Sequence, residues 1–236
     1  EGVGAQRLVL GSPAETSAKA QGEVSLDRDD NGELWLSNGH LQAKLGPKGV
    51  EQLQQRRGDG WGEPLLAEAM ALRRYGDRGE FWDAWDIASD YSSHALPMRW
   101  EPEEELLESG PLCTQLRWRG HCGQSPLQLS VRLQAGSPWL ELIITAQWRQ
   151  LHELLRCEWA LNHPGSFWCA DTPGGVQERS SRPRTPREQA RWEATAISWL
   201  WGGTNQAGLA VLLDGPQGVS GNNNGLGVSL LRGPTW

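Results

Sequence analysis

The stretch Leu127–Ala135 reads LQLSVRLQA, and apolar residues occupy every second position of it. Side chains of a β-strand point alternately to the two faces of a sheet, so this strand has one apolar face and one polar face. Such alternation is typical of an antiparallel strand that covers a core on one side only. The stretch therefore predicts an all-β protein.

Segments of the same kind lie on both sides of this strand. At 33–46, Asn38 and Gly39 separate two alternating runs, and we expect both to occupy hairpin turn positions with positive φ. Ile143 stands beside Ile144, which predicts a strand with two apolar faces in the middle of a two-sheet stack. Further strands are expected at 111–120, 139–148, 154–161, 190–201, 208–214 and 226–233.

Helical patterns are scarce in the chain. Residues 63–76, EPLLAEAMALRRYG, contain good helix formers at helix-like spacing, so a short helix and a strand are both compatible with them. Residues 182–189, RPRTPREQ, are expected to form a charged loop. The strands and turns together predict a large antiparallel β-sandwich at 33–236. Residues 1–32, rich in Gly, Ala, Ser and Asp, are expected to be a linker or a strand of a neighbouring domain.

Charge and composition argue against several kinds of partner. The net charge of −7 comes with interspersed signs and no basic stripe, so we expect no nucleic-acid partner. No run of about 18 apolar residues and no secretory pattern at the first residues is present, so we expect no membrane partner. The four cysteines lack CxxC spacing and are expected to be buried free thiols in a reducing compartment.

Catalytic motifs are also missing from the sequence. The five histidines show no HxH, HExxH or HxxxH spacing, so no metal site is expected in this chain. There is no GxSxG elbow and no Gly-rich phosphate loop. Asp83 and Asp86 would lie on opposite faces of a strand, which makes them a poor acid and nucleophile pair. We therefore expect no catalytic residue here.

The stretch Glu80–Tyr91, EFWDAWDIASDY, is too polar for a core strand and unusually aromatic for a loop. In one interpretation Trp82 and Trp85 fill the core while Asp83 and Asp86 cap turns. In the other, a loop presents flat rings and acceptor oxygens to a sugar, which binds by stacking its C–H face and hydrogen-bonding its hydroxyls. Composition is compatible with both.

This stretch closely resembles the WDAWDI signature in the C-terminal half of glycoside hydrolase family 38 α-mannosidases, in their bacterial and vacuolar-type branch. Other segments resemble that region in the same order: LSNGHLQAKLGPKG, ESGPLCTQLRWRG, LQAGSPWLELIITAQW, LLDGPQG and LGVSLLRGPTW. The resemblance covers Leu34–Trp236. It implies a β-sandwich of the galactose mutarotase-like supersandwich type, belonging to a retaining α-mannosidase.

In that family the nucleophile, the acid/base and the zinc ion belong to an N-terminal α/β barrel, which a helical bundle follows. The resemblance thus implies a fragment that is trimmed at its C-terminus and inactive by itself, with zinc expected only in the missing catalytic domain. It implies that the partners are the barrel and the helical domain of the same polypeptide and a mannose-containing oligosaccharide. A cytoplasmic location is expected.

By motif position, the resemblance implies that Trp82, Trp85, Asp86 and Arg232 lie at the edge of the substrate cleft. For Arg232, an internal salt bridge at a strand end is the alternative. The chain departs from the family pattern at RPRTPREQARWEA, which lacks a His and an Asn, and at LLDGPQGV, which lacks an aromatic residue. Contacts made by those family residues are not expected here.

Two other functions stay open on the sequence alone. A free-standing carbohydrate-binding module, with tryptophans as a stacking platform, would bind sugar as an isolated chain. A mutarotase-like epimerase on the same fold would need a His and a Glu that converge in one cleft, and the sequence indicates no such pair.

Overall fold

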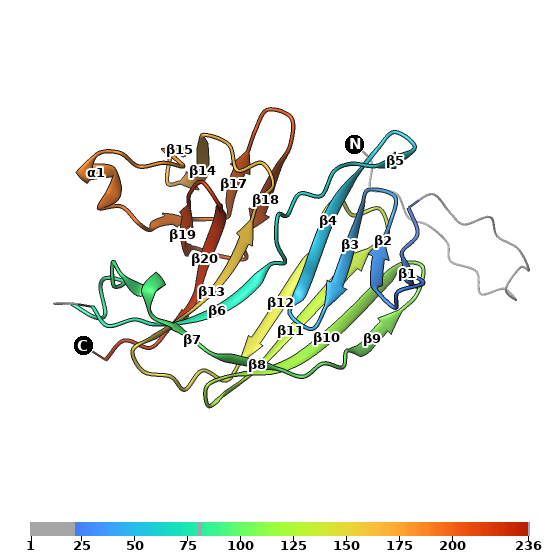
Figure 1. Cartoon of the computed structure of the whole chain (residues 1–236), viewed down its shortest axis with the longest axis horizontal. Coiled ribbons are helices and arrows are strands. Elements are labelled where there is room, and N and C mark those ends of the chain that lie inside the picture. Colours follow the sequence, from blue (N-terminus) through green and yellow to red (C-terminus); the bar gives the residue numbers. More distant parts are fainter. Residues whose placement is uncertain (1–21, 80–81, 236) are drawn as a thin grey trace, which may run out of the picture.

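A computed structural model describes residues 22–79 and 82–235, and the regular secondary structure within these residues is almost entirely antiparallel β-strand (Figure 1). The strands form four sheets. Two sheets pack face to face in the half of the molecule at the right of Figure 1, and the other two form the half at the left. The predicted all-β antiparallel fold is confirmed.

The right-hand half consists of two sheets, one built from β1 to β5 and the other from β8 to β12. One sheet has the order β1-β2-β3-β4-β5, with β1 Ser25–Arg28, β2 Leu34–Ser37, β3 Leu41–Gly46, β4 Gly49–Arg57 and β5 Gly60–Trp61. Its partner has the order β12-β11-β10-β8, with β9 also paired to β10. These strands are β8 Met98–Trp100, β9 Glu105–Ser109, β10 Cys113–Cys122, β11 Ser125–Gln134 and β12 Glu141–Ala146.

The left-hand half is built around a sheet of order β16-β19-β20-β13-β6-β7. Its strands are β6 Ala71–Gly76, β7 Ala95–Leu96, β13 Glu153–Ala160, β16 Ala194–Ala196, β19 Gln217–Gly221 and β20 Gly225–Arg232. The fourth sheet, β15-β14-β17-β18, consists of β14 Phe167–Thr172, β15 Gly175–Ser180, β17 Trp199–Gly203 and β18 Gly208–Leu212. Short helices occur at η1 Tyr91–Ser93 and α1 Pro186–Gln189.

One continuous apolar core runs through both halves. The alternating residues of β11 point into it, and Leu129, Val131 and Leu133 are completely buried. The same cluster includes Leu36 of β2 and Val228 of β20. Burying each such side chain contributes about 1.5–3 kcal/mol of transfer free energy. The period-two pattern therefore identified the core face of this strand correctly.

The predicted hairpin at 33–46 is confirmed as β2 and β3, but its turn differs from the expected one. Neither Asn38 nor Gly39 has a positive φ. Instead, the Asn38 N–H donates to the Leu41 carbonyl at 3.0 Å, and Asn38 Oδ1 accepts from the His40 N–H at 2.8 Å. The Asn38 side-chain amide also donates to the Gln134 carbonyl at 2.8 Å. Asn38 is thus used for side-chain hydrogen bonds rather than for a left-handed conformation.

The expectation that the strand with Ile143 and Ile144 lies in the middle of a stack is wrong. That strand is β12, which pairs with β11 alone at the edge of its sheet. Ile144 packs against the core, whereas Ile143 is 42% exposed on the outer face. Two adjacent apolar residues therefore did not require two buried faces.

For residues 63–76 the structure has a strand rather than a helix. β6 pairs with β13, and Leu72 lies opposite Cys157. Just before it, the Met70 N–H donates to the Val50 carbonyl at 2.8 Å. Pairing with neighbouring strands satisfies the backbone here and overrides the helical propensity of the sequence. The expected loop at 182–189 instead contains α1, whose capping box joins Thr185 and Glu188.

The structure also bears on the expected domain boundary, the cysteines and membrane-crossing segments. β1 pairs with β2, so the expected boundary at 32/33 falls in the turn between two paired strands. Residues 1–21 lie outside the described part of the chain. Three of the four free cysteines are buried: Cys113, Cys122 and Cys157. Across 22–79 and 82–235, no helix has the length and apolar character to cross a membrane.

Candidate functional site

The candidate site is a loop that follows β6, and its residues 82–91 are called the tryptophan loop below. The N–H groups of Trp85 and Asp86 both donate to the Trp82 carbonyl, at 2.8 and 3.1 Å, which forms a tight turn. Trp82 is 70% exposed and Trp85 is 88% exposed. The interpretation in which these two rings fill the core is therefore wrong. Glu80 and Phe81 lie outside the described residues.

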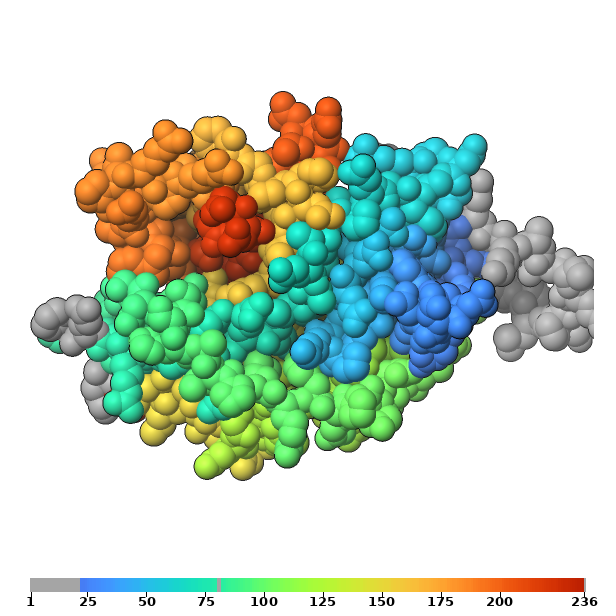
Figure 2. Space-filling model, in the orientation of Figure 1, coloured from blue at the N-terminus to red at the C-terminus, as the bar shows by residue number. Residues whose placement is uncertain are grey.

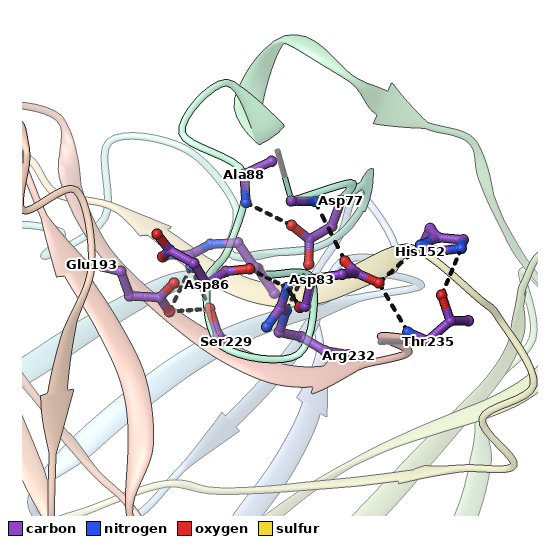
Figure 3. A network of polar contacts seen from close by, with 11 residues as sticks. Asp77, Asp83, Asp86, Ala88, His152, Glu193, Ser229, Arg232 and Thr235 are labelled. Atoms are coloured by element: carbon purple, nitrogen blue, oxygen red, sulfur yellow. Dashed lines mark hydrogen bonds and ion pairs between the residues drawn. The ribbon is translucent and has the colours of Figure 1, made fainter. Parts of the chain in front are cut away.

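Arg232, at the end of β20, points into this turn from below (Figure 3). Its Nε donates to Asp77 Oδ2 at 2.6 Å. Its Nη2 donates to the carbonyls of Asp83 at 3.0 Å and of Asp86 at 2.6 Å. The structure thus places Arg232 in the internal ion pair that was the alternative to a role at the cleft edge.

Asp77 joins the tryptophan loop to two other parts of the chain. Its side chain is 2% exposed, and while Oδ2 pairs with Arg232, Oδ1 accepts from the Ala88 N–H at 2.8 Å. Its own N–H donates to the His152 carbonyl at 2.8 Å. Both carboxylate oxygens are therefore occupied, as a buried charge requires.

Asp83 holds the loop from the opposite side and is buried, unlike its neighbours in the loop. Its Oδ2 accepts from the Thr235 N–H at 2.9 Å, and its Oδ1 accepts from the Gly79 N–H at 3.4 Å. Burial alone would raise the pKa of Asp83, but these N–H bonds and the charges of His152 and Arg232 outweigh burial and lower it. Asp83 is consequently held as a carboxylate.

His152 connects Asp83 to the last described residues. It has a φ of 53°, and its N–H donates to the Gly233 carbonyl at 2.7 Å. Its Nε2 lies 3.1 Å from Thr235 Oγ1. Its Nδ1 lies 3.0 Å from Asp83 Oδ2, so a protonated ring would form an ion pair with Asp83. The two atoms are not aligned for a hydrogen bond.

A second polar group, called the Arg156 cluster below, lies where the sheet meets the end of the loop. It consists of Arg156, Glu193, Ser220, Ser229 and Tyr91. Arg156 is 1% exposed. Its Nη1 donates to Ser229 Oγ, and its Nη2 donates to Ser220 Oγ at 2.6 Å. Its Nη1 also lies 3.3 Å from Glu193 Oε1. Its guanidinium covers the Tyr91 ring, 5.0 Å from the centroid.

The members of the Arg156 cluster come from distant parts of the chain. In Figure 2, the green region with η1 and the orange region with α1 flank the red region with β19 and β20 on this face. Burial raises the pKa of Glu193, although the Ser229 hydroxyl and the Arg156 charge oppose the shift. Within the described residues, Glu193 Oε2 is buried and has no hydrogen-bond partner. Sequence reasoning missed this cluster, although a lone Arg in the apolar strand LLRCEWAL was a usable signal.

The two carboxylates beside the exposed rings differ in their surroundings. Asp83 is buried and fully bonded, while Asp86 is exposed and offers its carboxylate to solvent. Among residues 22–79 and 82–235, no cluster of His, Cys, Asp or Glu has the arrangement that holds a metal ion. The described residues therefore do not fit a zinc site. The tryptophan loop thus presents to solvent the aromatic rings of Trp82 and Trp85 and the carboxylate of Asp86.

The fold is that of an antiparallel β-domain, and comparison with known proteins identifies its family. The model described as "Glycosyl hydrolases family 38 C-terminal domain" matches residues 36–236. The chain belongs to this family, as the sequence resemblance implied.

Relatives and solved structures agree with this assignment. Alpha-mannosidase 2C1 of Homo sapiens is 26% identical over 226 residues, covering 91% of this chain and 21% of that protein. Alpha-mannosidase G of Dictyostelium discoideum is 24% identical, covering 91% of this chain and 19% of that protein. The crystal structure of an alpha-mannosidase from Enterococcus faecalis V583 matches with a TM-score of 0.59 at 12% identity, over 92% of this chain and 26% of that one, which shows the shared fold. The chain spans about a fifth of the length of these curated relatives.

Proposed function

We propose that this chain is the C-terminal β-sandwich domain of a retaining α-mannosidase that hydrolyses terminal α-mannosides in the cytoplasm. The family match and the names of the relatives support the enzyme class. The small share of each relative that the chain covers supports its being one domain of a longer polypeptide. In this proposal the hydrolytic step and its zinc ion belong to a catalytic barrel outside this chain.

Within that enzyme, the domain supports the barrel and closes one side of the substrate cleft with the tryptophan loop. The observation that carries this role is the exposure of Trp82 and Trp85 on a loop whose backbone is held by buried hydrogen bonds. A large aromatic ring in water leaves much apolar surface uncovered, so two such rings on one turn indicate a contact surface. Asp86 adds an acceptor that a sugar hydroxyl can donate to.

The first test is the mass of the native polypeptide, captured from its source cells with an antibody against this chain. A mass several times the 26.1 kDa of these residues, together with zinc and mannoside hydrolysis in the captured protein, is the expected result. A mass close to 26.1 kDa would place no barrel on the same polypeptide and would overturn the proposal.

The exposed rings also favour a second candidate, a free-standing carbohydrate-binding module. The two candidates differ in the behaviour of the isolated chain. A cleft edge contributes only part of a sugar site, so titration calorimetry of the isolated chain with mannose and mannobiose should show no heat of binding. Saturable binding that is lost in Trp85→Ala would favour the module.

A further inference from the structure

We propose that Arg232 is a positioning residue: it holds the tryptophan loop so that Trp82 and Trp85 face outward in one fixed orientation, and it does not itself contact the sugar. The kinetic part of this inference rests on the proposed function. The structural part, that Arg232 orders the loop, is independent of the proposed function. The two parts therefore have separate readouts.

The first argument is the position of the Arg232 hydrogen bonds. Nη2 donates to the carbonyls of Asp83 and Asp86, which lie on either side of Trp85 in the chain. A single nitrogen thus fixes the backbone before and after the most exposed ring. Nε donates to the carboxylate of Asp77, which precedes the loop in the chain. The guanidinium therefore donates to three acceptors, one before the loop and two within it.

The second argument is burial. The Arg232 side chain is 19% exposed, and its partner Asp77 is 2% exposed. A charge-assisted hydrogen bond is shorter and stronger than a neutral one, and it is screened less when solvent is excluded. The pair is consequently suited to holding a backbone segment, and little of its surface is left for a ligand.

The third argument is a second set of contacts with the same effect. The buried carboxylate of Asp83 accepts from the Thr235 N–H, so the chain just beyond Arg232 also holds the turn. The loop is fixed at Asp83 from both directions while the rings of Trp82 and Trp85 stay in solvent. A surface that is ordered before binding loses less conformational entropy when it binds.

Arginine is the side chain that this geometry requires. Its planar fork donates in several fixed directions at once, whereas lysine offers one compact charge. Lysine at this position would pair with Asp77 or reach a loop carbonyl, but it would not hold all three acceptors in the observed arrangement. The inference therefore predicts only partial function for Arg232→Lys.

The structural readout is hydrogen–deuterium exchange on the full-length enzyme. In Arg232→Gln we expect exchange across residues 82–91 to be about tenfold faster, because the charged hydrogen bonds that close the loop are lost. Arg232→Lys should lie between this variant and the native protein. The matched control is Arg117→Gln. Arg117 lies on β10, is covered to a similar degree and forms an ion pair with Glu105 of β9. Unchanged exchange in Arg232→Gln would overturn the inference.

The kinetic readout is mannoside hydrolysis by Arg232→Gln, Trp85→Ala and the double variant. A positioning role predicts that Arg232→Gln raises KM more than it lowers kcat, and that the loss in the double variant is smaller than the sum of the two single losses. Additive losses would mean that Arg232 contacts substrate directly, which would overturn the inference. If Trp85→Ala leaves hydrolysis unchanged while Arg232→Gln still accelerates exchange, the cleft role of the loop falls and the holding role of Arg232 is supported.

Discussion

A side-chain carbon on Gly227 would overlap the Nη2 atom of Arg156. Gly227 lies on β20, where the missing side chain leaves room for the guanidinium of Arg156. Gly218 on β19 leaves the same kind of room beside Glu193 Oε1. The two glycines thus allow a charged cluster to be buried on a β-sheet surface that bulky residues would otherwise fill.

Gly227→Ala should therefore destabilise the domain by about 1–3 kcal/mol, because the guanidinium that must shift is buried and would lose its hydrogen bonds to Ser220 and Ser229. Thermal unfolding of the native and variant proteins would measure this loss. Gly175→Ala is the control, because a carbon added there meets nothing within 4 Å. Equal unfolding temperatures for both variants would contradict the close fit around Arg156.

Arg156 also neutralises a buried carboxylate. Arg156→Met should cost about 3–5 kcal/mol, because it leaves Glu193 covered and without its ion-pair partner. Adding Glu193→Gln to that variant should recover part of the loss, since the uncompensated charge is then removed. Denaturant unfolding would measure both. A double variant less stable than Arg156→Met would show that Glu193 contributes independently of Arg156.

Trp85→Ala should affect activity and stability very differently. Because the ring is 88% exposed, we expect a change in unfolding free energy within about 0.5 kcal/mol. In the full-length enzyme, kcat/KM for mannoside hydrolysis should fall about tenfold, as expected when a well-placed aromatic contact is lost. Leu129→Ala, at a completely buried position, should show the reverse and lose about 2–5 kcal/mol. Equal losses of activity and stability for Trp85→Ala would argue for a structural role.

Asp171 should make the stability depend on pH in the acid range. Its carboxylate accepts from the Ser198 hydroxyl at 2.6 Å and from the N–H groups of Ile197, Ser198 and Trp199 at 3.0, 2.9 and 3.1 Å. Burial opposes ionisation, but these hydrogen bonds outweigh it and lower the pKa of Asp171 from 3.8 to about 2.

Because the folded-state pKa is the lower one, the stabilisation by Asp171 is present above pH 3.8 and is lost as the pH falls toward 2. Asp171→Ala should therefore lower the unfolding temperature at pH 7, and the difference from the native protein should narrow as the pH falls from 4 to 2. Unfolding followed by circular dichroism across that range would test this. A difference that stays constant would mean that the charge of Asp171 contributes nothing.

The fold was predictable where a local pattern decides it. The alternation in β11 gave the core face, and the breaks between strands gave an antiparallel β-sandwich. The position of β12 was not predictable, because two adjacent apolar residues do not show whether a strand lies at the edge of its sheet or whether its outer face is covered. For Asn38 the residue type indicated a turn, but its amide bonds the carbonyl of Gln134 in another sheet, a partner that no local pattern specifies.

The candidate site was located by its sequence but not explained by it. The composition of residues 80–91 singled out the loop, and the family signature gave it a position. The alternatives for Arg232 could not be separated, because its partner Asp77 lies 155 residues away in the chain. The Arg156 cluster was missed because its five members come from five separate strands or loops, and no local pattern brings them together.

The hydrogen bond from the Thr235 N–H to Asp83 has a practical consequence for anyone who expresses this domain alone. A recombinant fragment that stops at Arg232 would lack the donor and also the Gly233 carbonyl that His152 binds. Its tryptophan loop would be released on one side, and a negative sugar-binding result would then reflect the choice of fragment end. Binding assays should use a fragment that extends past Thr235.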